Sequence, residues 1–258
     1  MIMGRVIGAV LAAGKGKRMQ DPTRPKVLAL LEGKPLLWYV LQALEPLNLE
    51  RTIAIVGYQR EQVIAYLAEH FPHVEYAVQA AQLGTGHAVL QLEESLRQWQ
   101  GTLLIANGDV PLVESNTYQA LLAQHHQTRA TMTVLTTMVP SPDGYGRILR
   151  EEDGTFCAIV EDADLEPNQR HITEINTGIY AAEVPLLFEV LRATSNANAQ
   201  GEFYLTDAVG ALRARGESVH AWCHPDWQQF LGVNTYQQLE ELAALLSARR
   251  RSTSAEVQ

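Results

Sequence analysis

The chain has 258 residues, 47% of them hydrophobic, which suits one large α/β domain with a sizeable core. A formal net charge of −9 argues against broad nucleic-acid binding, because that binding depends on neutralising phosphates with Lys and Arg. Two cysteines are too few for a disulfide framework. No apolar run approaches the ~20 residues that span a bilayer. We therefore expect a cytoplasmic protein that binds neither nucleic acid nor membrane.

The first 136 residues alternate between strand-like and helix-like stretches. The apolar run from Val6 to Ala13 is only eight residues long and leads straight into basic residues, so it indicates a buried parallel strand better than a signal peptide. This alternation predicts a Rossmann-like, mostly parallel sheet with helices on both faces. Further strands are expected at 52–56, 74–78, 103–106 and 130–135, and helices at 36–44, 61–68, 87–96 and 116–125.

After residue 140 the rhythm changes. We expect strands at 146–150, 156–161, 175–181 and 219–223, and helices at 185–191 and 204–213. These elements predict a smaller mixed-sheet region that extends the same sheet and forms one wall of a cleft. A last helix is expected at 236–248, before a flexible tail at 249–258. The chain then forms a single domain, 1–248, in three parts: 1–136, 137–234 and 235–248.

A glycine-rich loop directly follows the first strand, with the sequence L-A-A-G-K-G-K-R-M at 11–19. Its small residues let backbone N–H groups approach a phosphate chain, and its Lys and Arg residues neutralise the charge. A dinucleotide-binding fingerprint would need a small residue where Met19 stands. A Walker A loop needs Gly-Lys before Ser or Thr, whereas Gly16 follows Lys15. The loop therefore predicts a triphosphate site of another kind.

Several further motifs accompany this loop in chain order. They are Pro25-Lys26, Q-A-A-Q-L-G-T-G-H-A at 79–88, N-G-D-V-P-L at 107–112, G-Y-G-R-I at 144–148, I-V-E at 159–161, E-I-N-T-G at 174–178, N-A-Q-G-E-F-Y-L-T-D at 198–207 and G-V-N at 232–234. With these motifs the chain resembles the sugar-1-phosphate nucleotidyltransferase family. Within that family it is most similar to the uridylyltransferase domain of the bacterial bifunctional enzyme that makes UDP-N-acetylglucosamine.

The resemblance implies an enzyme that transfers UMP from UTP to N-acetylglucosamine 1-phosphate with Mg²⁺ as cofactor. Residues 1–136 would bind the nucleotide and residues 137–234 the sugar phosphate. The nucleotide contacts carried over are Leu11, Ala12, Ala13, Gly14, Lys26, Gln79, Gly84 and Thr85. The sugar-phosphate contacts are Gly146, Glu161 and Asn176, the catalytic residues are Arg18, Lys26 and Asp109, and the metal ligands are Asp109 and Asn234.

Structural alternatives stay open for several of these residues. Asp109 could cap a turn, Asn234 could be the N-cap of the last helix, and Glu161 belongs to an acidic run typical of a solvated loop. The chain also departs from the family pattern, because Lys17 stands where threonine is usual. No hexapeptide β-helix follows Asn234, so a one-domain relative and a piece of a longer protein both remain possible.

Alternatives for the function also stay open. Glucose 1-phosphate or another sugar phosphate could be the acceptor, and dTTP could replace UTP. A non-catalytic nucleotide-sensing module is a more distant alternative, which the presence of both Asp109 and Asn234 disfavours. The sequence does not determine the oligomeric state.

Overall fold

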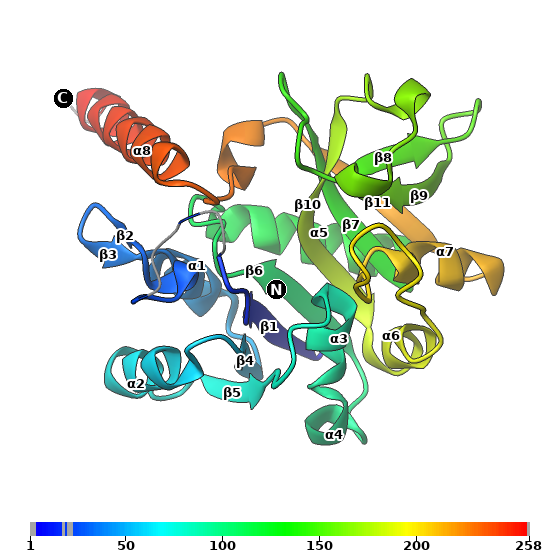
Figure 1. Ribbon diagram of the computed structural model, residues 1–258, viewed down its shortest axis with the longest axis horizontal. Coiled ribbons are helices and arrows are strands. Elements are labelled where there is room, and N and C mark those ends of the chain that lie inside the picture. The colour runs from blue at the N-terminus through cyan, green and yellow to red at the C-terminus, as the bar shows by residue number, and fades with distance from the viewer. Residues whose placement is uncertain (1–3, 17–18, 20–22, 257–258) are drawn as a thin grey trace.

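The computed structural model describes residues 4–16, 19 and 23–256, and a large central sheet organises them (Figure 1). The strands are β1 (Val6–Ala12), β2 (Leu30–Leu31), β3 (Lys34–Pro35), β4 (Arg51–Val56), β5 (Glu75–Val78), β6 (Thr102–Asn107), β7 (Met132–Met138), β8 (Arg147–Arg150), β9 (Phe156–Val160), β10 (Glu174–Glu183) and β11 (Val219–His224). The α-helices are α1 (Leu36–Leu44), α2 (Arg60–His70), α3 (Thr85–Leu90), α4 (Glu93–Leu96), α5 (Ser115–Thr128), α6 (Val184–Leu191), α7 (Asp207–Ala214) and α8 (Tyr236–Glu256).

The sheet is mostly parallel, and its main strand order is β11-β7-β10-β6-β1-β4-β5. β1 pairs in parallel with β4 and β6, and β4 pairs in parallel with β5. β10 runs antiparallel between β6 and β7, and the β8–β9 hairpin extends from its edge. The predicted fold class is confirmed. The carboxyl ends of β1, β5 and β6 meet at one edge of the sheet, where open α/β sheets bind ligands.

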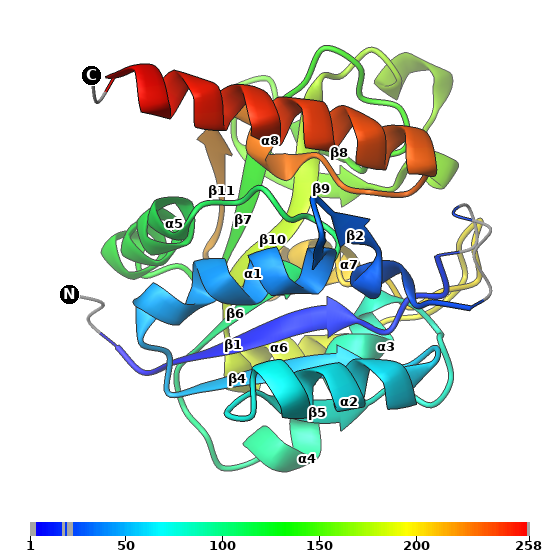
Figure 2. The same ribbon diagram turned by 90° about the vertical axis from the view of Figure 1, so that its left-hand side faces the viewer.

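Two hydrophobic cores cover the two faces of this sheet. Alternate residues of β1 face opposite sides, so Ile7 and Ala9 enter one core while Val6 and Val10 enter the other. The first core receives side chains from α3, α6 and α7, and the second receives side chains from α1, α2 and α5. Figure 2 shows α1 and α2 in front of β1 and β4. Because both faces are covered, the central strands are continuous apolar runs.

The expected division of the chain needs two corrections. The boundary between 136 and 137 falls inside β7, whose residues Met132 to Thr137 are all buried within the shared sheet. The last helix does not end at Ala248, because α8 continues to Glu256. Residues 249–256 contain neither glycine nor proline to stop a helix.

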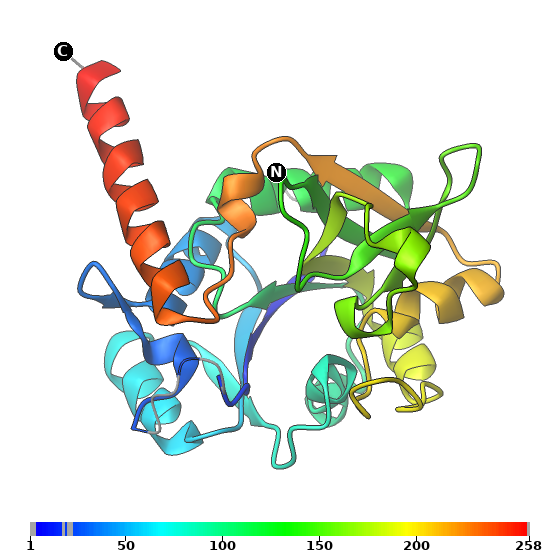
Figure 3. The same cartoon turned by 45° about the horizontal axis from the view of Figure 1, so that its top comes forward.

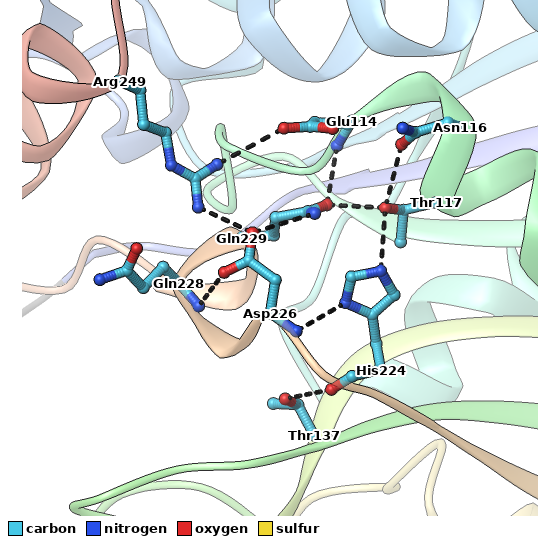
Figure 4. A network of polar contacts seen from close by, with 9 residues as sticks. All are labelled: Glu114, Asn116, Thr117, Thr137, His224, Asp226, Gln228, Gln229 and Arg249. Carbon is cyan, nitrogen blue, oxygen red and sulfur yellow. Dashed lines mark hydrogen bonds and ion pairs between the residues drawn. The ribbon is translucent and has the colours of Figure 1, made fainter. Parts of the chain in front are cut away.

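The long helix α8 projects from the body of the molecule (Figure 3) and is tied to it by side chains. Leu242 packs into a third apolar cluster with Leu31 and Val233. Figure 4 shows Arg249 reaching from α8 to Asp226, 2.9 Å away, and to Glu114, 3.6 Å away. These ion pairs lie just where the flexible tail was expected to begin, and they favour continued helix there.

Two local features differ from the expectation. The helix expected at 87–96 is divided into α3 and α4. Between them the backbone follows the tighter 3-10 pattern, because the N–H groups of Gln91 and Leu92 donate to carbonyls three residues earlier in the chain. The short β2–β3 hairpin was not predicted, since its strands have only two residues each. In the ranges described, no helix is long and apolar enough to cross a membrane.

Candidate functional site

A cleft of about 440 Å³ opens at the carboxyl ends of β1, β5 and β6. Most residues expected to bind nucleotide or metal line it: Leu11, Ala13, Gly14, Lys26, Gln79, Gly84, Thr85, Asp109 and Asn234. Ala12 is buried at the end of β1. Arg18 and Lys17 lie outside the described residues. The structure thus brings together side chains from motifs that are far apart in the sequence.

The glycine-rich loop leaves β1 and folds back over Lys26. The backbone N–H of Gly108 donates to Leu11 O (2.9 Å), and that of Tyr58 donates to Ala13 O (3.1 Å), which fixes the start of the loop between two neighbouring strand ends. Gly16 has φ +57°, and an added Cβ there would lie 2.7 Å from Lys26 Cβ. Only glycine allows this approach, so Gly16 determines how closely the loop lies over Lys26.

The ammonium group of Lys26 joins the two expected metal ligands. Its Nζ forms an ion pair with the Asp109 carboxylate and donates to Asn234 Oδ1 at 3.1 Å. The side chains of Lys26 and Asp109 are only 14% and 21% exposed, so water screens this pair incompletely. The positive charge of Lys26 therefore lies in the cleft between two oxygen-bearing side chains, those of Asp109 and Asn234.

The chemistry of these donors suits Mg²⁺. A carboxylate and an amide oxygen are hard ligands, and both already converge on one cationic atom. Throughout the ranges described, no three His, Cys, Asp or Glu side chains are grouped so that they could hold a metal. Two protein oxygens leave room for waters and substrate phosphates, as Mg²⁺ sites commonly do. Asp109 and Asn234 therefore fit the ion.

The 79–88 segment and the 198–207 segment are paired at the other end of the cleft. Phe203 donates its backbone N–H to Leu83 O and accepts from Gly86 N–H, both at 2.8 Å. Thr85 Oγ1 accepts from Leu205 N–H at 3.0 Å. Gly84 has φ +115°, and a Cβ there would contact the backbone of Phe203. These bonds position Gly84 and Thr85 at the mouth of the cleft.

The three expected sugar-binding residues lie together beside the cleft. Asn176 N–H donates to Gly146 O at 2.9 Å, and a Cβ on Gly146 would lie 3.5 Å from Glu161 Oε2. Asn176 stands where the register of β10 shifts against β7, a bulge that redirects side chains. Asn107 connects this group to the cleft, since it lines the cleft and its Nδ2 donates to Thr177 O at 3.3 Å.

Glu161 is half-buried and directly follows the end of β9. Burial raises its pKa above the usual range, and the neighbouring charges of Asp207, Asp164 and Glu202 raise it further. A hydrogen bond of 2.9 Å from Thr206 Oγ1 opposes this effect. Glu161 thus offers a hydrogen-bond acceptor in a poorly solvated position.

The sequence motifs contained further residues of the cleft that were not singled out. Asn107 is the first residue of the 107–112 motif, Gln82 belongs to the 79–88 segment, and Gln200 and Glu202 belong to the 198–207 segment; all four line the cleft. Thr206, in the same 198–207 segment, donates a hydrogen bond to Glu161. Their presence inside the matched motifs was the available signal.

Comparison with known proteins adds sequence and fold relatives. A sequence profile of the MobA-like NTP transferase domain matches residues 8–253. The bifunctional protein GlmU of Syntrophotalea carbinolica is 45% identical over 240 residues, an alignment that covers 93% of this chain and 51% of that protein. GlmU of Thermobifida fusca is 44% identical over 244 residues, covering 93% and 50%. The chain therefore spans about half the length of the curated relatives it matches.

A solved structure with a similar fold is a UDP-glucose pyrophosphorylase complexed with UDP-glucose. It superposes with a TM-score of 0.74 at 19% identity, covering 95% of this chain and 99% of that one. At this identity the similarity concerns the fold.

Proposed function

The chain belongs to the MobA-like NTP transferase domain family, and from that premise we propose that it transfers UMP from UTP to N-acetylglucosamine 1-phosphate and releases pyrophosphate. The observation that carries the proposal is the convergence of Lys26, Asp109 and Asn234 in the cleft behind the glycine-rich loop. The resemblance of the sequence motifs to a uridylyltransferase domain supports the choice of substrates.

The reaction is a displacement at the α-phosphorus of UTP. An oxygen of the sugar phosphate forms a bond to this phosphorus, while the bond to the oxygen that bridges to the β-phosphorus breaks and its electrons leave with pyrophosphate. A phosphate dianion is already nucleophilic, so no general base and no covalent enzyme intermediate are needed. Catalysis then comes from positioning and charge stabilisation.

Different residues of the cleft contribute to positioning and to charge stabilisation. Backbone N–H groups of the glycine-rich loop hold the triphosphate, and Lys26 neutralises charge that moves toward the leaving pyrophosphate. Arg18 has the same role by its place in the motif. Asp109 and Asn234 would hold Mg²⁺, which supplies further charge neutralisation on the phosphates when bound.

The acceptor sugar would lie against Gly146, Glu161 and Asn176. Glu161 would accept a hydrogen bond from a sugar hydroxyl or the N-acetyl N–H, which compensates the burial of its carboxylate. The Asn176 amide is oriented by Tyr180 Oη, which accepts from its Nδ2 at 2.7 Å, and by Gly178 N–H, which donates to its Oδ1 at 3.0 Å. These bonds hold Asn176 beside the proposed sugar position.

Pyrophosphate release with UTP, Mg²⁺ and candidate sugar phosphates tests the proposal. We expect release with N-acetylglucosamine 1-phosphate and much slower release with glucose 1-phosphate. Faster release with glucose 1-phosphate would keep the reaction type and change the acceptor. No release with any sugar phosphate, from folded protein that binds UTP, would contradict the enzymatic proposal and favour a nucleotide-sensing role.

A further inference from the structure

The segment that carries Asn234 is held directly against the segment that carries Asp109. The N–H of the buried Val233 donates to Asp109 O at 3.1 Å. Gly232 lies over the same carbonyl, since a Cβ added there would lie 4.0 Å from Asp109 O. These contacts determine where the chain brings Asn234 to the cleft. They leave the direction of its side chain to the residues that follow.

The side chain of Thr235 caps the start of α8. Its Oγ1 accepts from the Gln238 N–H at 3.2 Å, and its carbonyl oxygen accepts from the Leu239 N–H at 3.1 Å. Thr235 thus supplies the cap that was an open alternative for Asn234. Asn234 Oδ1 accepts from Lys26 Nζ at 3.1 Å in the cleft.

The side chain of Gln238 reaches back past this cap to the backbone of Asn234. Its Oε1 accepts from the Asn234 N–H at 2.7 Å. An N–H group can only donate, so the oxygen of the Gln238 amide must face it. In a capping box, a side chain at this position of the helix bonds to the N–H of the cap residue itself, here Thr235. Gln238 instead bonds one residue earlier, to the residue whose side chain lines the cleft.

The backbone on both sides of Asn234 is therefore fixed. The bond from Gln238 sets the peptide plane before Asn234, and the cap formed by Thr235 holds the chain after it. The positions of N, Cα and C determine where Cβ lies, so these bonds direct the Asn234 side chain toward Lys26 Nζ, which also contacts Asp109. Gln238 is half-buried and lies outside the described lining of the cleft. It acts on the backbone of the expected metal ligand.

We propose that Gln238 is a positioning residue for the metal site, which holds Asn234 Oδ1 beside the Asp109 carboxylate by fixing the backbone of Asn234. The inference rests on the proposed function, because it takes Asp109 and Asn234 as the ligands of Mg²⁺. Outer hydrogen bonds that orient metal ligands typically change metal affinity by about 10- to 100-fold. Loss of the Gln238 acceptor therefore weakens binding of a divalent cation.

Variants at position 238 test whether the acceptor matters. Gln238→Met keeps the length of the side chain and removes the acceptor, and Gln238→Ala removes it by truncation. Gln238→Glu keeps an oxygen that can accept from the Asn234 N–H. Gln237→Met is the matched control, since Gln237 is exposed and bonds Glu241 one turn along the helix.

The readout is the dissociation constant for Mn²⁺ alone, used in place of Mg²⁺ and measured by electron paramagnetic resonance. The Mg²⁺ concentration that gives half-maximal transfer is the second readout. We expect Gln238→Met and Gln238→Ala to raise both values by about tenfold or more. Gln238→Glu and Gln237→Met should stay close to wild type. At saturating Mg²⁺ the kcat of Gln238→Met should return close to the wild-type value, because the groups that contact substrate are unchanged.

A role confined to the stability of α8 gives a different result. Gln238→Met would then lower the Tm and speed amide hydrogen exchange in residues 235–240, while its dissociation constant for Mn²⁺ stayed at the wild-type value. That outcome would overturn the proposal. Equal dissociation constants in Gln238→Met and Gln238→Glu would also overturn it, since of these two variants the second alone keeps the acceptor.

Asp109→Ala and Asn234→Ala separate this inference from the proposed function. If neither weakens Mn²⁺ binding, the metal assignment is wrong and the role of Gln238 is wrong with it. If both weaken binding while Gln238→Met does not, the role of Gln238 alone is wrong. If the wild-type protein binds Mn²⁺ but transfers nothing from UTP, the proposed reaction is wrong, and the dissociation constants still decide the role of Gln238.

Discussion

The ammonium group of Lys26 lies between the oxygen atoms of two side chains that come from distant parts of the sequence. Asp109 follows β6 and Asn234 precedes α8, and both contact the same nitrogen atom. Each residue belongs to a separate motif, so the sequence predicted the three as site residues. It did not predict their direct contact, because a distance between segments 208 residues apart depends on the folded sheet.

Replacing Lys26 by methionine should remove charge stabilisation while keeping the length of the side chain. We expect Lys26→Met to lower kcat by about 100-fold or more, the range seen when a preorganised stabilising group is removed. Steady-state kinetics at saturating UTP measures this effect. Lys34→Met is a matched control, since Lys34 lies over the Trp38 ring at the surface. A near-normal kcat in folded Lys26→Met would contradict its catalytic role.

Glu161 gives a prediction about pH and stability. Since burial raises the pKa of folded Glu161, protonation favours the folded state: this contribution is fully present below the unfolded pKa of about 4.3 and is lost as the pH rises through the folded value. Glutamine is neutral at every pH. We therefore expect Glu161→Gln to raise the Tm at about pH 7 and to leave it close to wild type at about pH 4.

The same variant should bind the sugar phosphate more weakly, because an amide oxygen is a poorer acceptor than a carboxylate. Calorimetric melting and the KM for the sugar phosphate measure the two effects. An unchanged KM would contradict the assignment of Glu161 to the sugar. A lower Tm at about pH 7 would contradict the view that ionised Glu161 destabilises the protein without its ligand.

At the scale of elements, periodicity predicted most strands and helices, since continuous apolar runs and 3.6-residue spacing follow from burial. α1 was predicted at its observed limits, Leu36–Leu44. The elements that were missed depend on tertiary contacts. The β2–β3 hairpin is only two residues long on each side. α8 continues past Ala248, where Arg249 finds Asp226 and Glu114.

Arg249 should hold the distal half of α8 to the body of the molecule. We expect Arg249→Ala to speed amide hydrogen exchange in residues 243–256 while kcat stays within the error of wild type, since Arg249 does not line the cleft. Exchange measured by mass spectrometry reports this change. Gln237→Ala, which removes an exposed contact with Glu241 on the same helix, is the control. Unchanged exchange in Arg249→Ala would show that packing alone anchors the helix.

At the scale of the whole molecule, the two halves of the chain share one sheet. β10, from the second half, lies between β6 and β7 of the first, so the cleft is built from both. The motif order predicted which residues meet there. The strand order could not be predicted from the sequence, because the insertion of an antiparallel strand depends on packing over both faces.

Transfer of label from UTP tests the central claim most directly. UTP labelled at the α-phosphorus is incubated with N-acetylglucosamine 1-phosphate and Mg²⁺, using the wild-type protein and Asp109→Asn. We expect the label in UDP-N-acetylglucosamine with the wild-type protein and transfer at least about 100-fold slower with the variant. Label released as free UMP, or equal transfer by folded Asp109→Asn, would contradict nucleotidyl transfer in this cleft.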